Sequence, residues 1–561
     1  MDTRLKLVRV VVLLTFVALL WRLSVLQITR HEQYANASSS QATVEASPTT
    51  TRGNIFFSNK DERVIAATEK DFYTLAINPK KITDKEAVYE HLSQFVTLER
   101  EDFDRRAART FDPFEILAKR ITSAQRDEIL VNAPVGIEFL ADRLRYYPGG
   151  STAAHVLGFI GGDERGETGK YGVEQYYNDR LATNLSSDAD GPTFLELLRT
   201  SLQYDAGGGD IVLTVDIGVQ KKIERTLAKT LEKWQATRGG IIVVDPKTGG
   251  ILGMAGTPTF DPNTYYDTDS ISAFTNPNIQ YRFELGSIVK PLTMAAAIDS
   301  GAVTEQDTYY DAGYIMSDGF RIENFDGKGR GTVPIQQILS QSLNTGVVHL
   351  MREIGRETFG EYLMKFGLGE QTDIDLFGEV PGNIANLNPR REVEYATAAF
   401  GQGISITPIG LTMALSAIAN GGELVRPHVV DKFIAASGEV IQVRPEKKHR
   451  VIREESALVV QRMLVTVVDE ALANGNATIP GYTMGAKTGT AQIASSEERG
   501  YGGEFLHSFF GFAPGFDARF LVLLYVERPV GARYASQTLT EPYSEIMEFL
   551  LAYYNVPPDR L

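Results

Sequence analysis

The chain has 561 residues and an apolar fraction of 43%, enough to build a large core shared by about two to four domains. Its 56 basic and 71 acidic residues give a net charge of −15, which argues against a general nucleic-acid-binding protein. Without cysteine, disulfides, thiolate catalysis and cysteine-ligated zinc are excluded, and seven scattered histidines predict no metal centre.

The N-terminus predicts a membrane anchor. Three basic residues precede an apolar run, Val10 to Trp21, which becomes long enough to cross a bilayer if flanking arginines extend to the interfaces. We therefore expect a cytoplasmic tail at 1–6, a transmembrane anchor at 7–28 and the remaining chain outside the cytoplasm. A cleaved signal peptide is the alternative, although the small-residue site at Ala35-Asn36-Ala37 lies well beyond the apolar run.

Two further segments precede the regular part of the chain. Residues 35–51 are small and polar, which is typical of a flexible or extended stalk. Residues 52–205 combine short β-like runs, charged helical patches and glycine-rich turns without a catalytic motif, and we interpret them as a mixed α+β pedestal. The glycine cluster and alternating run at 204–216 mark its predicted boundary.

Residues 210–558 predict one α+β layered domain. Ile217 to Trp234 has helical periodicity, and Arg238 to Gly256 predicts a hairpin whose two apolar strands are joined by a D-P-x-x-G-G turn. Two terminal helices are expected to bracket an antiparallel sheet that carries a helical insert. The other predicted elements are a buried helix at 287–300, three strands within 482–494, 507–515 and 519–529, and an amphipathic helix at 541–554.

Three short motifs occur in one order along this domain. They are Ser287-Ile288-Val289-Lys290, Ser342-Leu343-Asn344 and Lys487-Thr488-Gly489, and the first two patterns occur once in the chain. A second lysine-threonine-glycine copy, Lys247-Thr248-Gly249, lies in the turn of the predicted hairpin. There these residue types are simply turn formers, so we interpret that copy as structural.

The first motif indicates a nucleophilic serine with a lysine base. On a helix, residues three apart share a face, so Lys290 can reach the Ser287 hydroxyl. Pro291 is tolerated only in a first helical turn, which places Ser287 at the positive end of the helix dipole. A buried lysine near a second cation loses its proton readily and becomes a usable base. Taken alone, however, Ser287 would more often be a helix N-cap.

The second motif offers a proton relay beside that pair. Ser342 can pass a proton to a leaving amine, and Asn344 can hold both Lys290 and a substrate amide. By itself this motif would be read as a capping or turn element. Its position between the other two motifs favours the functional interpretation.

The third motif predicts a carboxylate site on a strand. Lys487 offers a fixed cation, the Thr488 and Thr490 hydroxyls flank it, and Gly489 leaves room for an extended substrate against the strand. The backbone N–H groups of Ser287 and Thr490 are candidate oxyanion-hole donors. Alone, this motif would be a strand end with a solvated lysine.

The ordered set resembles the S-x-x-K, S-x-N and K-T-G motifs of penicillin-binding proteins and serine β-lactamases. Other stretches narrow the resemblance to class B penicillin-binding proteins, the membrane-anchored monofunctional transpeptidases, although Phe57-Ser58 stands where that family usually has Asp-Arg. The similar stretches are RGNIFFSNKDERVIAA, RYYPGGSTAAHVLGFIG, GVEQYYNDRL, GGIIVVDPKTGGILGMA, AFGQGISITPIGL and PGYTMGAKTGTAQ.

This resemblance implies an α+β penicillin-binding transpeptidase fold, an antiparallel sheet covered by helices with a helical subdomain, behind a dimerisation-like pedestal. It implies that a peptidoglycan stem peptide acylates Ser287 with Lys290 as base, and that an amine of a neighbouring stem then forms the cross-link. β-Lactams would acylate the same serine, and neither metal nor cofactor is required. The implied site residues are Ser287, Lys290, Ser342 and Asn344 for catalysis and Lys487, Thr488, Gly489 and Thr490 for substrate binding.

The implied partners are a SEDS-family glycosyltransferase and other membrane proteins of a cell-wall synthesis complex at the bacterial inner membrane. The pedestal contains no recognisable glycosyltransferase motif, and the pattern favours division over side-wall elongation. The residues leave three alternatives open. Water could replace the acceptor amine, giving a D,D-carboxypeptidase or a β-lactamase, or the chain could be a non-catalytic scaffold.

Overall fold

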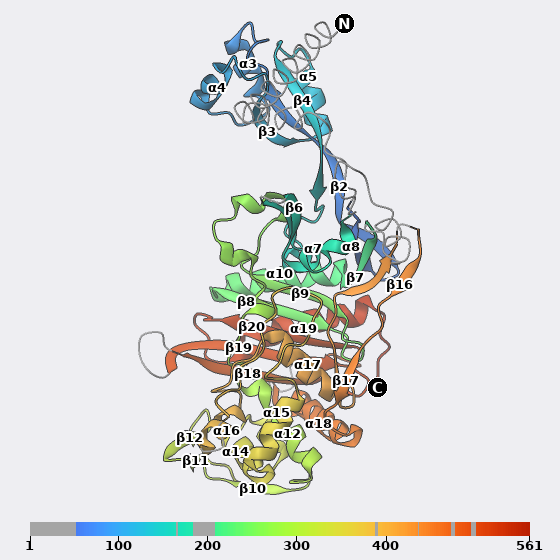
Figure 1. Ribbon diagram of the computed structural model, residues 1–561. Helices are drawn as coiled ribbons and strands as arrows, with labels where there is room; N and C mark the ends of the chain where they lie inside the picture. The colour runs from blue at the N-terminus through green and yellow to red at the C-terminus, as the bar shows by residue number, and fades with distance from the viewer. Residues whose placement is uncertain are drawn as a thin grey trace, which may run out of the picture. The chain divides into compact units, whose positions relative to one another are not determined.

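A computed structural model describes residues 52–163, 166–182, 208–387, 391–435, 437–472, 477–494 and 501–560 (Figure 1). The predicted anchor at 7–28 and stalk at 35–51 lie outside these ranges. Within them, no helix is both long and apolar enough to cross a bilayer.

A five-stranded antiparallel sheet with the order β18-β19-β20-β8-β9 supports the three motifs. Every residue of β20 is buried because helices cover both faces of the sheet, whereas β18 lies at one edge. The predicted hairpin is formed by β8 and β9. The strands are β8 (Arg238–Val244), β9 (Ile251–Thr257), β18 (Gly485–Ala494), β19 (Tyr501–Ala513) and β20 (Phe520–Glu527).

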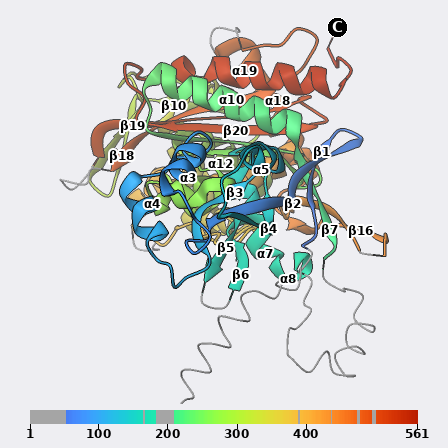
Figure 2. The same cartoon turned by 90° about the horizontal axis from the view of Figure 1, so that it is seen from above.

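The two terminal helices, α10 (Ile217–Trp234) and α19 (Ala535–Tyr553), lie side by side on one face of the sheet (Figure 2). The sequence predicts that these two helices bracket the sheet, but they pack against each other on the same face. Glycines on the strands show the two faces: a Cβ on Gly239 would meet Leu227 of α10, whereas one on Gly240 would meet Asn278 on the other side. The second helix also begins at Ala535 rather than at 541.

The opposite face is covered by the long insert between β9 and β18. Its helix α17 (Pro408–Ala419) is buried at every position because it lies between the sheet and other helices. The other covering elements are α11 (Pro277–Gln280), η4 (Gly286–Val289), α12 (Lys290–Ser300) and α18 (Glu454–Thr466). Short elements in the remaining chain are η2 (Pro262–Asp267), η3 (Ile271–Phe274), β14 (Glu423–Val425), β17 (Lys447–Arg450) and η5 (Val467–Ala471).

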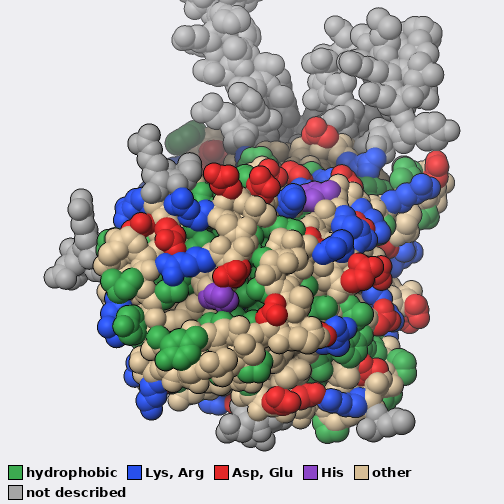
Figure 3. All heavy atoms as spheres, turned by 90° about the horizontal axis from the view of Figure 1, so that it is seen from below, with side chains coloured by type: hydrophobic (Ala, Val, Ile, Leu, Met, Phe, Trp, Pro, Cys, Tyr) green, Lys and Arg blue, Asp and Glu red, His purple; other side chains and the backbone are tan. Residues whose placement is uncertain are grey.

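The insert also forms the predicted helical subdomain. Two small hairpin-like sheets, β10 with β13 and β11 with β12, flank its helices. Seen from below, acidic and basic side chains are interspersed on this end of the molecule (Figure 3). Its elements are β10 (Thr308–Asp311), β11 (Tyr314–Ser317), β12 (Phe320–Glu323), β13 (Gly331–Pro334), α13 (Gln336–Ser340), α14 (Asn344–Ile354), α15 (Arg356–Lys365) and α16 (Glu392–Ala398).

A second, seven-stranded sheet joins strands from both sides of the predicted pedestal boundary. β7 pairs in parallel with β1 and antiparallel with β15, so the run placed at the boundary is a central strand. The domain limits 52–205 and 210–558 stay predictions. The strands are β1 (Ile55–Asn59), β2 (Glu62–Ile77), β3 (Glu115–Ile121), β4 (Ile137–Tyr146), β7 (Asp210–Asp216), β15 (Val430–Ile434) and β16 (Val440–Gln442).

The far ends of β2, β3 and β4 build a small core of their own with three helices. Its buried residues include Leu75, Val88, Phe103 and Ile129. The helices are α3 (Lys85–Leu92), α4 (Arg100–Ala107) and α5 (Ser123–Leu130), and the remaining N-terminal elements are α6 (Ala154–Leu157), β5 (Phe159–Asp163), β6 (Gly166–Lys170), α7 (Gly172–Tyr176) and α8 (Asn178–Leu181).

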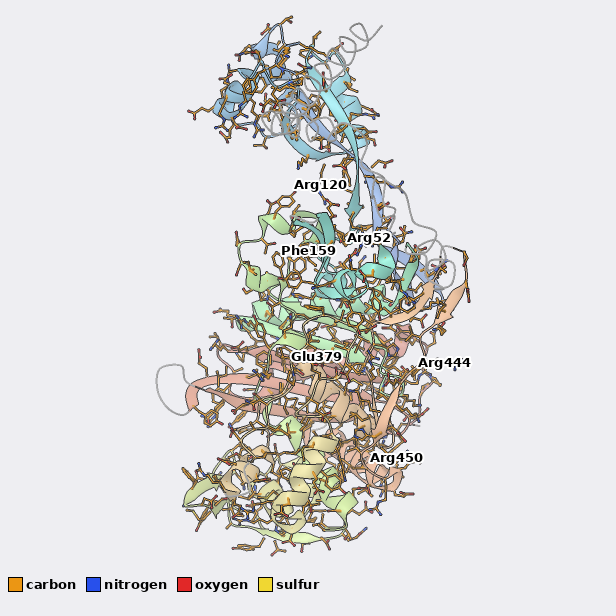
Figure 4. All side chains as sticks on the ribbon, in the orientation of Figure 1. Arg52, Arg120, Phe159, Glu379, Arg444 and Arg450 are labelled. Carbon is orange, nitrogen blue, oxygen red and sulfur yellow. The ribbon has the colours of Figure 1, made fainter. Side chains whose placement is uncertain are left out.

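A buried ion cluster ties the start of β1 to α7. Glu174, fully buried, accepts hydrogen bonds from Arg52 Nε at 2.7 Å and from Arg145 Nε at 2.7 Å. The Arg145 guanidinium also donates to the Gly53 carbonyl at 2.8 Å. Figure 4 shows Arg52 between the positions of β2 and α8 in Figure 1. Two guanidinium groups thus neutralise one carboxylate away from water, and they connect segments far apart in sequence.

Candidate active site

Ser287 lies in the one-turn helix η4, which runs directly into α12 with Pro291 in its first turn, as the sequence predicts. The turn depends on Gly286, whose φ of +65° is in the left-handed region that favours glycine. Two hydrogen bonds hold the turn: Gly286 N donates to Gly401 O at 3.2 Å, and Ser508 Oγ of β19 donates to Leu285 O at 2.7 Å. The serine is therefore presented by a braced, preformed turn.

Lys290 is completely buried at the start of α12. Its Nζ donates to Ser342 O at 2.6 Å and to Asn344 Oδ1 at 2.7 Å, and it lies 3.2 Å from Ser342 Oγ. Burial, and after it the charge of Lys487, holds the pKa of Lys290 well below its usual value. A neutral amine has two N–H groups, and the two carbonyl oxygens Ser342 O and Asn344 Oδ1 can accept both of them. The lone pair is then left for a hydroxyl.

The first two motifs thus lie side by side, as predicted. The contacts that join them are those of Lys290 with Ser342 and Asn344. The hydrogen bonds of the described residues include none between the Ser287 and Lys290 side chains, which share one helical turn. Ser342 has a φ of +54°, and Asn344 is the first residue of α14. The Asn344 Nδ2 group donates to Glu323 O at 2.9 Å, so its Oδ1 is the atom that faces Lys290.

Lys487 lies on β18, as predicted, and is 3% exposed. Its Nζ donates to Thr488 O at 3.1 Å, and burial lowers the pKa of Lys487 to about 8. Thr490 Oγ1 accepts the Ala535 N–H at 3.0 Å, which leaves its own hydroxyl proton for another acceptor. Because β18 is the edge of its sheet, an extended peptide could add to it as a further strand.

Gly489 has a different role from the one its sequence context suggested. A Cβ at this position would lie 2.7 Å from Leu285 O and 3.1 Å from Ile288 N. The missing side chain therefore lets the turn that carries Ser287 approach β18, and the space does not belong to the substrate. In contrast, the Lys247 copy of the motif lies in the β8–β9 turn, where its exposed amine pairs with Asp517.

The structure adds residues near the motifs that sequence patterns did not indicate. Tyr501 of β19 donates to Glu284 Oε2 at 2.9 Å, three residues before Ser287, and burial raises the pKa of that carboxyl group. Glu323, the last residue of β12, and Asn324, which follows it, contact the start of α14. No motif marks these positions, since the contacts arise between segments distant in sequence. Within the described ranges, no cluster of three histidine or acidic side chains could hold a metal ion.

Comparison with known proteins agrees with this architecture. The family model described as "Penicillin binding protein transpeptidase domain" matches residues 239–548, and "Penicillin-binding Protein dimerisation domain" matches residues 48–187. Stage V sporulation protein D of Bacillus subtilis is 32% identical over 491 residues, which cover 85% of this chain and 74% of that protein. The peptidoglycan D,D-transpeptidase FtsI of Escherichia coli is 27% identical, over 80% of this chain and 74% of its own length.

Solved structures share the fold. Penicillin-binding protein 2X of Streptococcus thermophilus superposes with a TM-score of 0.71 at 21% identity, covering 91% of this chain and 80% of that one. Apo penicillin-binding protein 3 of Mycobacterium tuberculosis gives a TM-score of 0.66 at 28% identity, covering 75% and 93%. Since the transpeptidase family model alone spans more than half of the sequence, the chain belongs to the class B penicillin-binding proteins, the D,D-transpeptidase family.

Proposed function

We propose that this protein cross-links peptidoglycan stem peptides through an acyl-enzyme on Ser287. The observation that carries the proposal is the environment of Lys290, a fully buried amine whose two shortest contacts are carbonyl oxygens. Burial and the charge of Lys487 hold the pKa of Lys290 well below its usual value, so this amine loses its own proton readily and can take the proton of a neighbouring hydroxyl.

The steps follow from this geometry. Ser287 Oγ attacks the carbonyl carbon of the penultimate D-alanine while its proton moves to Lys290. The tetrahedral intermediate collapses to an ester, and the terminal D-alanine leaves as an amine that receives a proton through Ser342. The amine of a second stem peptide then attacks the ester and forms the new amide. Its proton returns to Ser287 through the same groups, so the enzyme is regenerated.

Lys487, Thr488 and Thr490 are the residues that would bind the substrate. Lys487, with Thr488 and Thr490 beside it, would hold the terminal carboxylate of the donor peptide as that peptide lies along β18. The N–H groups of Ser287 and Thr490 would stabilise the oxyanion. Penicillin-binding protein 3 of Mycobacterium tuberculosis has been solved in complex with aztreonam and with ampicillin, which supports binding of β-lactams by this chain. We expect these ligands to acylate Ser287.

The first experiment is labelling of the full-length protein with a fluorescent penicillin. We expect labelling of wild type and its loss in Ser287→Ala. Ser300→Ala, at the other end of the same helix, is the control and should label normally, because its hydroxyl only caps Ala297 O. Equal labelling of Ser287→Ala and wild type would refute the assignment.

A second experiment separates transpeptidation from hydrolysis. With a donor stem peptide and an acceptor amine, we expect a cross-linked dimer together with released D-alanine. Release of D-alanine without dimer would identify a carboxypeptidase, and rapid loss of the penicillin label would identify a β-lactamase. If the protein is labelled but forms no cross-linked dimer and releases no D-alanine, the scaffold role would be favoured.

We further propose that the protein acts in division, from a single-pass anchor in the bacterial inner membrane and together with a SEDS-family glycosyltransferase. The stretch Ala399 to Pro408 and the pedestal pattern support division over elongation. A fluorescently tagged copy should therefore gather at the septum. A uniform side-wall signal would contradict the division role and leave the chemistry unaffected.

A further inference from the structure

Asp311, at the end of β10, is a carboxylate that none of the motifs contains, and it is 1% exposed. It accepts backbone N–H groups from Gly313 at 2.9 Å and Arg330 at 3.1 Å. It also accepts the Thr345 hydroxyl at 2.8 Å and the Asn324 amide, which lies 3.0 Å from each of its oxygens. Burying a carboxylate is costly unless its lone pairs are matched, and here donors from four separate segments match them.

This cluster reaches the active site through Asn324. With its Nδ2 group committed to Asp311, the Oδ1 atom of Asn324 faces α14 and accepts the Thr345 N–H at 3.2 Å. The preceding carbonyl, Glu323 O, accepts the Nδ2 group of Asn344 at 2.9 Å. One short segment, 323–324, therefore holds the start of α14 by two adjacent hydrogen bonds.

The orientation of the Asn344 amide follows from this arrangement. Because Nδ2 is bound to Glu323 O, Oδ1 points at Lys290 Nζ, 2.7 Å away. If the amide turned over, its N–H groups would face Lys290 and would compete for the lone pair that must take the Ser287 proton. The oxygen-inward orientation is the one compatible with a lysine base.

We propose that Asp311 and Asn324 are positioning residues for acylation: they hold segment 323–324 so that the Asn344 amide presents its oxygen to Lys290. The proposal rests on the acyl-enzyme function proposed above. Asp311 and Asn324 do not touch the substrate in this account. They act through Asn344, which contacts the base.

The test is Asp311→Asn, an isosteric change that removes an acceptor and turns a donor toward the N–H groups of the cluster. We expect the acylation rate constant for a fluorescent penicillin to fall about tenfold to hundredfold, as is typical when a supporting hydrogen bond is lost. The concentration giving half-maximal acylation should change little, because Lys487, Thr488 and Thr490 are untouched. Asp307→Asn, the same change at an exposed position preceding the same strand, is the matched control and should acylate at the wild-type rate.

The pH profile distinguishes positioning from simple destabilisation. Losing the carbonyl acceptor on Lys290 disfavours the ammonium form, so the acidic limb of the acylation rate should move to lower pH while the maximum falls. A variant that is only partly unfolded would keep the acidic limb of its acylation rate at the same pH as wild type, and the rate would fall in proportion to the folded fraction. That outcome, or an unchanged rate, would overturn the proposal.

A second pair of variants keeps the test decisive if Asp311→Asn does not fold. Thr345→Val removes one donor to Asp311 and preserves the side-chain shape, whereas Thr345→Ser retains the hydroxyl. We expect a smaller effect of the same kind in the valine variant and recovery in the serine variant. Equal rates for both would refute the role of the cluster. Failure of wild type to label at Ser287 would instead refute the proposed function itself.

Discussion

At the scale of single residues, the site contains two buried lysines, and the pKa values of both are lowered. Burial disfavours the ammonium form of both, but Lys290 also experiences the charge of Lys487. The pKa of Lys290 is therefore lowered by two causes, whereas that of Lys487 is lowered by burial alone, to about 8. In the proposed mechanism one residue type thus supplies both the proton acceptor and the carboxylate anchor.

We therefore expect a bell-shaped pH profile for acylation by carboxylate-bearing ligands. As pH rises through the lowered pKa of Lys290, the base becomes neutral and the rate increases. Above the pKa of about 8, Lys487 loses its charge and the rate declines. Labelling rates measured across buffers give the profile, and a rate that keeps climbing far above this pKa would show that Lys487 need not be charged.

The two lysine-threonine-glycine copies allow a matched comparison. Lys487→Ala should slow acylation by a carboxylate ligand about tenfold or more, the equivalent of the ~1.5–3 kcal/mol of a hydrogen bond to a charged group. It should also shift the acidic limb to higher pH, because the repulsion that lowers the pKa of Lys290 is removed. A carboxylate-free ligand should be affected less.

Lys247→Ala is the control for this comparison. It breaks only an exposed ion pair with Asp517, so acylation should be unchanged and unfolding free energy should stay within about 1 kcal/mol of wild type. An equal loss of acylation in both variants would contradict the structural interpretation of the turn copy.

At the scale of elements, the site depends on how closely η4 approaches β18. Gly489 permits the approach, since a Cβ there would lie 2.3 Å from Ser508 Oγ and 2.7 Å from Leu285 O. Ser508 is the residue that holds Leu285 O, so the strand and the turn are joined at this point. The placement of Ser287 relative to Lys487 is set by this contact.

Gly489→Ala should therefore push the turn away from the strand. We expect a cost of about 1–3 kcal/mol in unfolding free energy from overpacking and a loss of acylation of about a hundredfold, as for a displacement near 1 Å at a reacting centre. Gly503→Ala on β19 is the control, because nothing lies within 4 Å of its Cβ position. Normal acylation by Gly489→Ala with a preserved melting temperature would refute this account.

At the scale of the whole molecule, the N-terminal strands are joined to the transpeptidase part by shared structure. β7 lies between β1 and β15 in one sheet. In addition, the Glu174 carboxylate pairs with both Arg52 and Arg145. Both features link segments separated by more than a hundred residues. The connection between the N-terminal strands and the transpeptidase part is therefore built into the folded core and is not a simple linker.

Glu174→Ala should leave the buried guanidinium group of Arg145 and the partly buried one of Arg52 without their carboxylate. We expect a loss of about 3–5 kcal/mol in unfolding free energy, measured by chemical denaturation of the detergent-solubilised chain. Glu541→Ala removes the exposed partner of Lys233 and should cost no more than about 1 kcal/mol. Similar small losses in both variants would show that the buried cluster contributes little.

Much of the fold could be predicted from local patterns. Helical periodicity placed α10 at its observed bounds, and turn chemistry placed the β8–β9 hairpin. The sequence does not predict the start of α19, because all of residues 535–540 except Leu539 are small or polar and give no amphipathic signal, although Gln537 and Tyr534 cap the helix. Local patterns also do not say on which face of a sheet a helix packs, since that depends on neighbours distant in sequence.

The sequence by itself determined the family, the order of the three motifs and the residues expected to carry the chemistry, because each motif is a short pattern whose residue types the reaction requires. Only the tertiary structure decided which atoms meet: that Lys290 donates to Ser342 and Asn344, that Gly489 makes room for the Ser287 turn, and that Asp311 accepts the Asn324 amide. These contacts join segments tens to hundreds of residues apart, and long-range packing alone brings them within hydrogen-bonding distance.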